Sequence, residues 1–250
     1  MSVLFPAFCD LCHELISHAA DSTICSPCWA LLGPIRGPVC AQCGDVIVSG
    51  RTPEGWRCGR CRRGMTHFDL CRSYGFYEDP LRKVLHRFKY GKRTRLGPRL
   101  AGLLYQQWLT SPGLQQAEIL LPAPLHRRRQ RARGFNQSEL LAKHLSQMIH
   151  LPLESPALER TRRTTSQTGL SPRQRRLNVS GAFRVRKPAS IRGRNCLLID
   201  DVFTTGATLN EMASVLREAG ATKVLALTLA RVSPRGAIAT PKGMLGRSES

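Results

Sequence analysis

The order of apolar and polar positions along the chain predicts strands that alternate with helices. Short apolar runs, which are typical of buried strands, occur at 71–77, 117–125, 181–185, 195–202 and 223–232, with a further short strand expected within 151–161. Apolar residues spaced three or four apart predict amphipathic helices at 79–91, 95–109, 136–149 and 208–220. Because strands and helices alternate in the second half of the chain, we predict an α/β fold with a parallel, doubly wound sheet.

Local signals refine where two of these helices begin. Asn136 is a favourable N-cap, and Glu139 follows it three residues later, as in a capping box. Thr208 and Glu211 have the same spacing, so we predict that the last helix begins at Thr208.

Basic residues are concentrated away from the N-terminal part of the chain. The chain holds 38 Lys and Arg against 17 Asp and Glu, a net charge of +21. Residues 1–80 hold 7 basic and 8 acidic side chains, so the excess lies in residues 81–250, with 31 against 9. Part of it falls in a predicted loop at 126–135 and in a mobile arm at 162–178, where a short helix is expected from Ser171. This distribution favours polyanionic partners, such as phosphorylated small molecules or nucleic acid, over a passive solvated surface.

The cysteines near the N-terminus form a pattern that predicts zinc. Eight of the ten cysteines form four C-x-x-C pairs, and these pairs are Cys9/Cys12, Cys25/Cys28, Cys40/Cys43 and Cys58/Cys61. Two such pairs, separated here by 12 and 14 residues, offer four thiolates to one tetrahedral Zn²⁺. We predict two closed structural zinc sites, paired in sequence order as a double zinc ribbon, although an interleaved pairing uses the same cysteines.

A disulfide scaffold and a redox centre both fit these cysteines less well than zinc does. Disulfides need an oxidising compartment, and the start of the chain, MSVLFPAFCDLC, lacks the basic region of an export signal. A redox motif accounts for one pair and not for four. Since no apolar run approaches the roughly 18 residues of a membrane span, we expect a cytoplasmic protein. Cys71 and Cys196 are expected to be ordinary buried thiols.

These features divide the chain into three expected parts. Residues 1–65 are expected to form the double zinc ribbon, residues 66–232 the α/β domain, and residues 233–250 a disordered tail. With thiolates and zinc included, the ribbon carries net negative charge, which favours a scaffolding or partner-docking role over DNA binding by the ribbon itself.

The stretch NCLLIDDVFTTGATLNE, residues 195–211, carries the clearest functional signal. Its apolar start predicts a central strand, so Asp200 and Asp201 fall at the carboxyl end, where ligands bind in parallel sheets. The residues from Thr204 to Thr208 form a small-residue loop before a helix, and its backbone N–H groups can donate to an anion. A phosphate cradle beside two carboxylates that can accept from vicinal hydroxyls predicts a site for a ribose 5-phosphate.

The common nucleotide-binding loops are absent from the sequence. It contains no G-x-x-x-x-G-K-[ST] loop and no G-x-G-x-x-G after a strand, which argues against P-loop and Rossmann sites. A phospho-acceptor domain explains the paired acids but leaves the Thr-Thr-Gly loop unexplained. A solvated acidic turn is the alternative without a ligand.

The same residues resemble a known family. LLIDDVFTTGATL resembles the 5-phosphoribosyl-1-pyrophosphate signature of type I phosphoribosyltransferases. The segments LPAPLHRRRQRARGFNQSELLA and SQTGLSPRQRRLNVSGAF, with the C-x-x-C series, are similar to the ComF/GntX family over residues 1 to about 232. The resemblance implies a type I phosphoribosyltransferase-like parallel sheet after a zinc-ribbon module. It also implies a role in DNA uptake, natural competence or the use of external DNA.

The resemblance further implies roles for individual residues. Asp200 and Asp201 are the implied catalytic acids, and they bind the ribose hydroxyls. The residues implied to hold the 5-phosphate are Thr204, Thr205, Gly206, Ala207 and Thr208. The resemblance implies a pyrophosphate loop at Leu125, His126 and Arg127, and a flexible hood at Arg162, Gln167 and Arg175. The implied ligand is phosphoribosyl pyrophosphate with Mg²⁺, and the implied reaction displaces pyrophosphate by an acceptor that the sequence does not identify.

A binding module without catalysis is the main alternative. Basic runs at 82–99 and 126–133, with Phe88, Tyr90 and Phe135 among them, could bind the backbone of single-stranded DNA and stack its bases. Such a module would bind phosphoribosyl ligands or single-stranded DNA and work with cytoplasmic DNA-uptake proteins. Pyrophosphate and hood contacts account for the same residues, and a regulator that has lost turnover is a third hypothesis.

Overall fold

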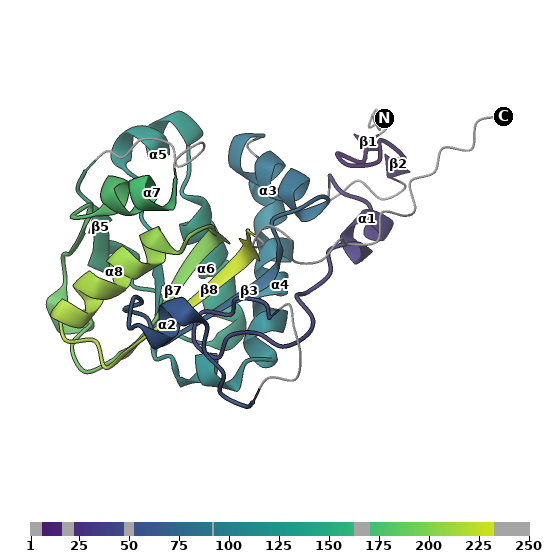
Figure 1. The fold of residues 1–250 in the computed structure, drawn as a ribbon. Helices are drawn as coiled ribbons and strands as arrows, with labels where there is room; N and C mark the ends of the chain where they lie inside the picture. The colour runs from purple at the N-terminus through teal and green to yellow at the C-terminus, as the bar shows by residue number, and fades with distance from the viewer. Residues whose placement is uncertain (1–6, 17–22, 48–52, 92, 163–170, 233–250) are drawn as a thin grey trace.

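A four-stranded parallel sheet lies at the centre of the computed structural model, which describes residues 7–16, 23–47, 53–91, 93–162 and 171–232 (Figure 1). The strands, in their order across the sheet, are β3 (Leu70–Phe76), β8 (Lys223–Arg231), β7 (Asn195–Phe203) and β4 (Ile119–Pro122). Because all four strands run parallel, their carboxyl ends meet along one edge of the sheet. The strand that ends in the paired aspartates is one of the two inner strands, as the sequence predicts.

Helices cover both faces of this sheet (Figure 1). One face is covered by α3 (Leu81–Tyr90), α4 (Gly97–Leu109) and α6 (Gln137–Ile149). The other face is covered by α8 (Ala207–Glu218), which packs beside α7 (Pro172–Val179) and the antiparallel pair β5 (Leu158–Arg160) and β6 (Phe183–Val185). The predicted α/β class and parallel sheet are therefore confirmed.

Alternation along the central strand explains the two cores. Leu197 and Ile199 of β7 belong to the core beneath α4 and α6, whereas Cys196 and Leu198 belong to the core beneath α8. All four side chains are fully buried. A strand buried on both faces must be apolar at consecutive positions, which is why this segment reads as a continuous apolar run.

The predicted loop at 126–135 is wrong, whereas Cys71 and Cys196 are buried thiols as predicted. The basic segment expected to be a loop instead contains α5 (Arg127–Arg133). His126 caps this helix by accepting a hydrogen bond from the backbone of Arg128, and Gly134 ends it in the left-handed conformation. Burial raises the pKa of Cys71 to about 11 and that of Cys196 to about 12, so both are neutral buried thiols.

The eight paired cysteines gather into two clusters in sequence order. The first zinc unit, residues 7–16 and 23–32, contains β1 (Ala7–Phe8), β2 (Leu15–Ile16) and α1 (Ser26–Ala30). The second zinc unit, residues 38–47 and 53–65, contains α2 (Gly59–Arg62). In each unit the later C-x-x-C pair caps and enters a short helix, and the four sulfur atoms lie within 4.8 Å of one another. The sequential pairing is therefore the one that the structure shows.

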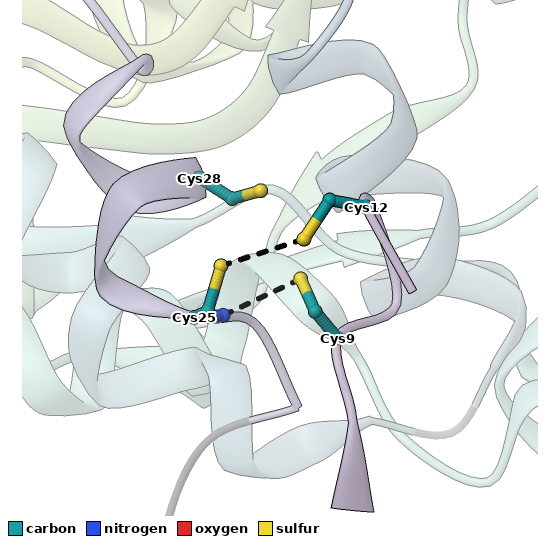
Figure 2. Close-up of side chains that lie close together, drawn as sticks. All are labelled: Cys9, Cys12, Cys25 and Cys28. Atoms are coloured by element: carbon teal, nitrogen blue, oxygen red, sulfur yellow. Dashed lines mark hydrogen bonds between the residues drawn. The ribbon is translucent and has the colours of Figure 1, made fainter. Parts of the chain in front are cut away.

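The geometry of both clusters fits a tetrahedral zinc ion. Zn–S bonds of about 2.3 Å place neighbouring sulfurs about 3.8 Å apart. The Sγ atoms of Cys12 and Cys25 are 3.7 Å apart (Figure 2). Those of Cys43 and Cys58 are also 3.7 Å apart. Backbone N–H groups also donate to the sulfurs, for example from Cys25 to Cys9 at 3.4 Å. Each cluster is thus suited to a structural zinc ion without an open coordination position.

The two zinc units pack on opposite faces of the sheet. In the first unit, Trp29 is buried against the α3–α4 side, with the guanidinium of Arg99 4.4 Å from its ring centre. In the second unit, the backbone carbonyl of Cys43 accepts a 2.9 Å hydrogen bond from the fully buried Arg231 at the end of β8. A Cβ atom at Gly44 would lie 2.7 Å from the Cys71 carbonyl oxygen, so the turn at Cys40–Gly44 packs directly on β3.

None of the described helices is long and apolar enough to cross a membrane.

Loss of the second cluster is expected to destabilise the protein more than loss of the first. Cys43 is fully buried, whereas Cys12 is partly exposed. Cys43→Ser should lower the melting temperature by about 10 °C or more, because it removes a zinc ligand and also disturbs the packing of a buried cluster. Cys12→Ser should lower it by less, because Cys12 is partly exposed and contributes less packing. Thermal unfolding and metal analysis together measure both effects.

The control is Cys196→Ser, which changes a buried thiol outside both clusters and should keep two zinc ions per chain. Fewer than two zinc ions in the wild-type protein, or equal effects of the two cluster variants, would contradict the expectation.

Candidate ligand-binding site

A cavity of about 720 Å³ opens at the carboxyl ends of β7 and β4. We call it the main cavity, and it is lined by the end of β7, the loop after it, the loop after β4, and parts of α3, α5, α6 and α7. Its ionisable lining comprises two carboxylates and five cations, and these are Asp200, Asp201, Lys89, Arg129, Arg133, Arg160 and Arg175. The excess of positive charge makes this cavity suitable for a polyanion.

Asp200 is held in place from two directions. Its Oδ1 accepts a 3.0 Å hydrogen bond from the Ser138 hydroxyl and a 2.9 Å hydrogen bond from the backbone N–H of Asp201. Ser138 is itself positioned because Asn136, the N-cap of α6, accepts from its backbone N–H and donates to the Ala123 carbonyl. Burial raises the pKa of Asp200, against the opposing effects of Lys89 and the Ser138 hydrogen bond.

Asp201 forms an ion pair with a residue that is distant in sequence. Its Oδ2 contacts the ammonium group of Lys89, which comes from the last turn of α3. Both side chains are largely buried, with 8% and 16% of their side-chain surface exposed. Burial lowers the pKa of Lys89 to about 8, although the Asp200 carboxylate acts in the opposite direction. At neutral pH the lysine therefore remains mainly a cation, and it is poised between two carboxylates.

Two arginines extend the positive wall of the main cavity. Burial lowers the pKa of Arg160 to about 10, so its guanidinium still carries a charge at neutral pH. It comes from β5 and lies 5.2 Å from the ring centre of Phe183. Arg133, from the last turn of α5, lies over the ring of Tyr90 at 5.0 Å. These cations reach the cavity from separate elements, so the tertiary fold, and not one basic run, creates the wall.

The loop between β7 and α8 contains a glycine in the left-handed conformation immediately before the helix. Gly206 has φ of +74° and caps α8, a conformation that glycine adopts without steric cost. A Cβ atom here would also lie 2.5 Å from Cζ of Phe203, so the position has no room for another side chain. The same loop also lines a smaller cavity of about 210 Å³, together with α7, α8 and the second zinc unit.

The structure brings many of the sequence-predicted site residues together. The main cavity is lined by Asp200, Asp201, Thr204, Thr208, Leu125 and Arg175. The smaller cavity is lined by the remaining loop residues, Thr205, Gly206 and Ala207. The two sets belong to a single turn, so the predicted phosphate loop contributes to both cavities.

Three predicted residues lie outside the lining of both cavities, and a fourth lies outside the described residues. His126 caps α5, and Arg127 is exposed at the start of that helix; neither lines the main cavity among the described residues. Arg162 donates to the backbone carbonyls of Asn178 and Ser180, so it braces the segment after α7. Gln167 lies outside the described residues.

The predicted capping of α8 is wrong, and the helix begins at Ala207, one residue before the predicted start. Gly206 is the N-cap, which places Thr208 inside the first turn of the helix. Glu211 does not complete a capping box, because its Oε1 accepts a 2.6 Å hydrogen bond from the backbone N–H of Gly181. The left-handed glycine determines where the helix begins, and a spacing pattern does not reveal that conformation.

Several residues of the main cavity are not predictable from the sequence patterns. The helical pattern predicts that Lys89 lies on the polar side of a surface helix. In the structure, its ammonium group instead contacts Asp201. Ser138 reads only as part of a helix start, and Arg160 as part of a short strand. One local signal exists for Lys89, since it follows the buried Phe88 at the end of an apolar helix face, where a cation is close to the core.

Comparisons with known proteins agree with this architecture. A model of the double zinc ribbon domain matches residues 1–62, and a model of the phosphoribosyl transferase domain matches residues 136–238. The DNA utilization protein YhgH of Escherichia coli O157:H7 is 34% identical over 229 residues, covering 90% of this chain and 97% of that protein. Competence protein F of Haemophilus influenzae is 32% identical over 218 residues, covering 86% and 93%.

A solved structure shows a more distant likeness. Glutamine phosphoribosylpyrophosphate amidotransferase from B. subtilis, in complex with ADP and GMP, is 20% identical with a TM-score of 0.38. The match covers 54% of this chain and 26% of that chain.

Together, the parallel sheet, the acid-ended central strand and the two cysteine clusters define a phosphoribosyltransferase-type domain joined to a double zinc ribbon. The extent of the matches to YhgH and competence protein F then shows the family. The chain belongs to the ComF/GntX family.

Gly206→Ala is expected to destabilise the protein by about 2–4 kcal/mol, because alanine disfavours a positive φ and its Cβ would overlap the Phe203 ring. Gly102→Ala is the matched control. It lies within α4 with no other atom within 4 Å of a Cβ, so alanine should stabilise by about 0.5–1 kcal/mol. Urea unfolding at neutral pH measures both, and equal effects of the two substitutions would contradict the assigned loop conformation.

Proposed function

We propose that the main cavity binds 5-phosphoribosyl-1-pyrophosphate, and that the protein acts as a phosphoribosyltransferase in the uptake or use of external DNA. The carrying observation is the meeting, in one cavity, of two strand-end carboxylates, the two threonines at either end of the glycine turn before α8, and five cations. Carboxylates suit the hydroxyls of a ribose, the turn suits its phosphate, and the cations suit a pyrophosphate. The ligand presents these three chemical groups in a single molecule.

The ribose and its 5-phosphate are assigned to the end of β7 and the loop after it. Asp200 and Asp201 accept hydrogen bonds from the vicinal hydroxyls in this proposal. Asp200 is already oriented by Ser138, so little reorganisation is needed when the sugar binds. The phosphate lies against the turn from Thr204 to Thr208, where the N-terminal end of α8 presents its first backbone N–H groups.

The pyrophosphate is assigned to the loop after β4 and to the cations opposite the carboxylates. Leu125 lines the cavity in this loop, and Arg129 and Arg133 approach it from α5. His126 and Arg127 are retained as part of the predicted pyrophosphate loop, with His126 acting through its cap on α5. Lys89, which the sequence did not predict, is added to the pyrophosphate site, since a bound polyanion would give its ammonium group a second partner besides Asp201.

The hood is assigned to the segment around α7, with Arg175 facing the cavity and Arg162 bracing the base of the segment. Its closure excludes water, which would otherwise hydrolyse the activated ribose. Mg²⁺ bound with the pyrophosphate would neutralise charge on the leaving group. Asp200 and Asp201, the carboxylates that line the cavity, would help to hold the ion. The cations then stabilise the charge that develops as pyrophosphate leaves the anomeric carbon.

The assignment to DNA metabolism rests on the relatives. They are named as a DNA utilization protein and a competence protein, and the matches extend over most of both chains. We further propose that the protein acts in the cytoplasm, where it would meet DNA-uptake partners. All ten cysteines are free of disulfide bonds, and eight are arranged for metal, which suits a reducing compartment.

Phosphoribosyl pyrophosphate with Mg²⁺ is expected to bind the wild-type protein, and Asp200→Asn is expected to bind it about 10- to 100-fold more weakly. The asparagine keeps the shape but loses charged hydrogen bonds to the ribose hydroxyls, each worth about 1.5–3 kcal/mol. Isothermal titration calorimetry measures the difference directly.

Glu218→Gln is the matched control, because it removes the same charge at the exposed far end of α8. It should bind like the wild type. The ribose-phosphate assignment fails if the wild type does not bind, or if Asp200→Asn binds equally well.

A second candidate function, binding of single-stranded DNA, is favoured by one exposed aromatic side chain. Tyr90 is 64% exposed at the rim of the main cavity, between the His86 ring at 4.8 Å and the Arg133 guanidinium at 5.0 Å. Phe88, which the sequence suggested for stacking together with Phe135, is fully buried, and it packs against the partly buried Phe135 at 5.6 Å. The rim therefore presents the exposed Tyr90 ring among cations, a suitable platform for one base.

Tyr90→Ala is expected to weaken binding of a short oligothymidine by about 5- to 100-fold, since one stacked base contributes about 1–3 kcal/mol. The slope of affinity against salt should not change, because no charge is removed. Phe8→Ala, an exposed aromatic on the first zinc unit, is the control. Fluorescence anisotropy measures both variants, and an unchanged affinity of Tyr90→Ala would exclude base stacking at this ring.

A further inference from the structure

The second zinc unit contacts the proposed phosphate loop directly. Arg60 lies between Cys58 and Cys61, within the knuckle that supplies two of the four thiolates. Its Nη1 donates a 2.5 Å hydrogen bond to the backbone carbonyl of Thr205. Both residues line the smaller cavity, and neither lines the main cavity. A metal-binding turn and a ligand-binding turn, 145 residues apart in sequence, thus share one hydrogen bond.

The other knuckle of the same cluster reaches the loop through two buried side chains. Arg231 donates to the Cys43 carbonyl at 2.9 Å, and its guanidinium lies 4.7 Å from the ring centre of Phe203. That ring packs against Gly206, where a Cβ atom would be 2.5 Å away. Arg60 also lies 5.7 Å from the Phe203 ring centre. Both halves of the second cluster therefore brace the same turn.

The contact with Thr205 fixes the direction of the next backbone N–H. A trans peptide bond is planar, so the N–H of Gly206 points opposite to the Thr205 carbonyl and hence away from Arg60. Glycine tolerates both signs of φ, so the sequence of the loop alone does not prevent this peptide from turning over. A cation on the carbonyl selects one orientation and polarises the N–H as a donor.

We infer that Arg60 is a positioning residue, through which the second zinc unit holds the Thr205–Gly206 peptide with its N–H directed to the 5-phosphate. This inference rests on the proposed binding of a ribose 5-phosphate group in the main cavity. It gives the zinc unit a part in ligand affinity as well as in stability. The effect is local to the phosphate end of the ligand, because Arg60 does not line the main cavity.

The test compares Arg60→Ala with Arg62→Ala, which removes the same charge from an exposed position of the same short helix. Ribose 5-phosphate and inorganic pyrophosphate are titrated separately into the full-length, zinc-loaded proteins. Arg60→Ala should weaken ribose 5-phosphate binding about 10-fold and leave pyrophosphate binding unchanged. Arg62→Ala should change neither, and both variants should retain two zinc ions per chain.

A second measurement does not depend on any ligand. The backbone amide signal of Gly206 in the ¹⁵N–¹H spectrum should shift in Arg60→Ala, and this amide should exchange its hydrogen at least several-fold faster, whereas Arg62→Ala should leave it unchanged. If the wild type binds ribose 5-phosphate and Arg60→Ala binds it equally well, the inference is overturned and the proposed function stands. If the wild type binds no ribose 5-phosphate, both are overturned, whatever the amide shows. An unchanged Gly206 amide also overturns the inference.

Discussion

The inner strand β7 is hydrogen-bonded along both edges and buried on both faces, and this constraint shapes the site. Its side chains reach a cavity only at the carboxyl end, so the two aspartates there are partly removed from water. Charges in such a position need partners. Lys89 and Ser138 supply them from helices on one face, and Arg160 adds positive charge from the antiparallel pair of β5 and β6 on the other. The two aspartates at the end of β7 therefore draw polar and charged side chains around them, and these side chains make the main cavity polar.

The zinc units address a different physical need. A loop-rich segment of this size buries too little apolar surface to order itself, and metal coordination supplies the missing free energy. Once ordered, each unit presents apolar and carbonyl groups to one face of the sheet, through Trp29 in the first unit and the Cys43 knuckle in the second. The ribbon thus shares its two cores with the α/β domain, and the second unit extends this contact as far as the turn before α8.

Much of this architecture is predictable from the sequence, because it depends on short-range patterns. The C-x-x-C spacing defines the clusters, and the apolar run before Asp200 and Asp201 identifies the strand, which continues two residues beyond them to Phe203. Contacts between distant segments are not predictable in this way. Lys89 meets Asp201 only because α3 packs beside the end of β7, and Arg60 meets Thr205 only because a zinc knuckle docks there. The predicted capping of α8 is wrong for a related reason, since the left-handed Gly206, which packs against Phe203, takes the N-cap position in place of Thr208.

The position of β8 between β3 and β7 has a consequence for how the chain is made. Each cysteine cluster draws on residues close together in sequence, so both can take up metal early in translation. The sheet, however, cannot close until its last strand has left the ribosome, because β3 has no other partner in the sheet among the described strands. Arg231, the last residue of that strand, also completes the seat for the Cys43 knuckle. The zinc units are thus among the first parts of the nascent chain to fold, and the second unit is among the last to dock.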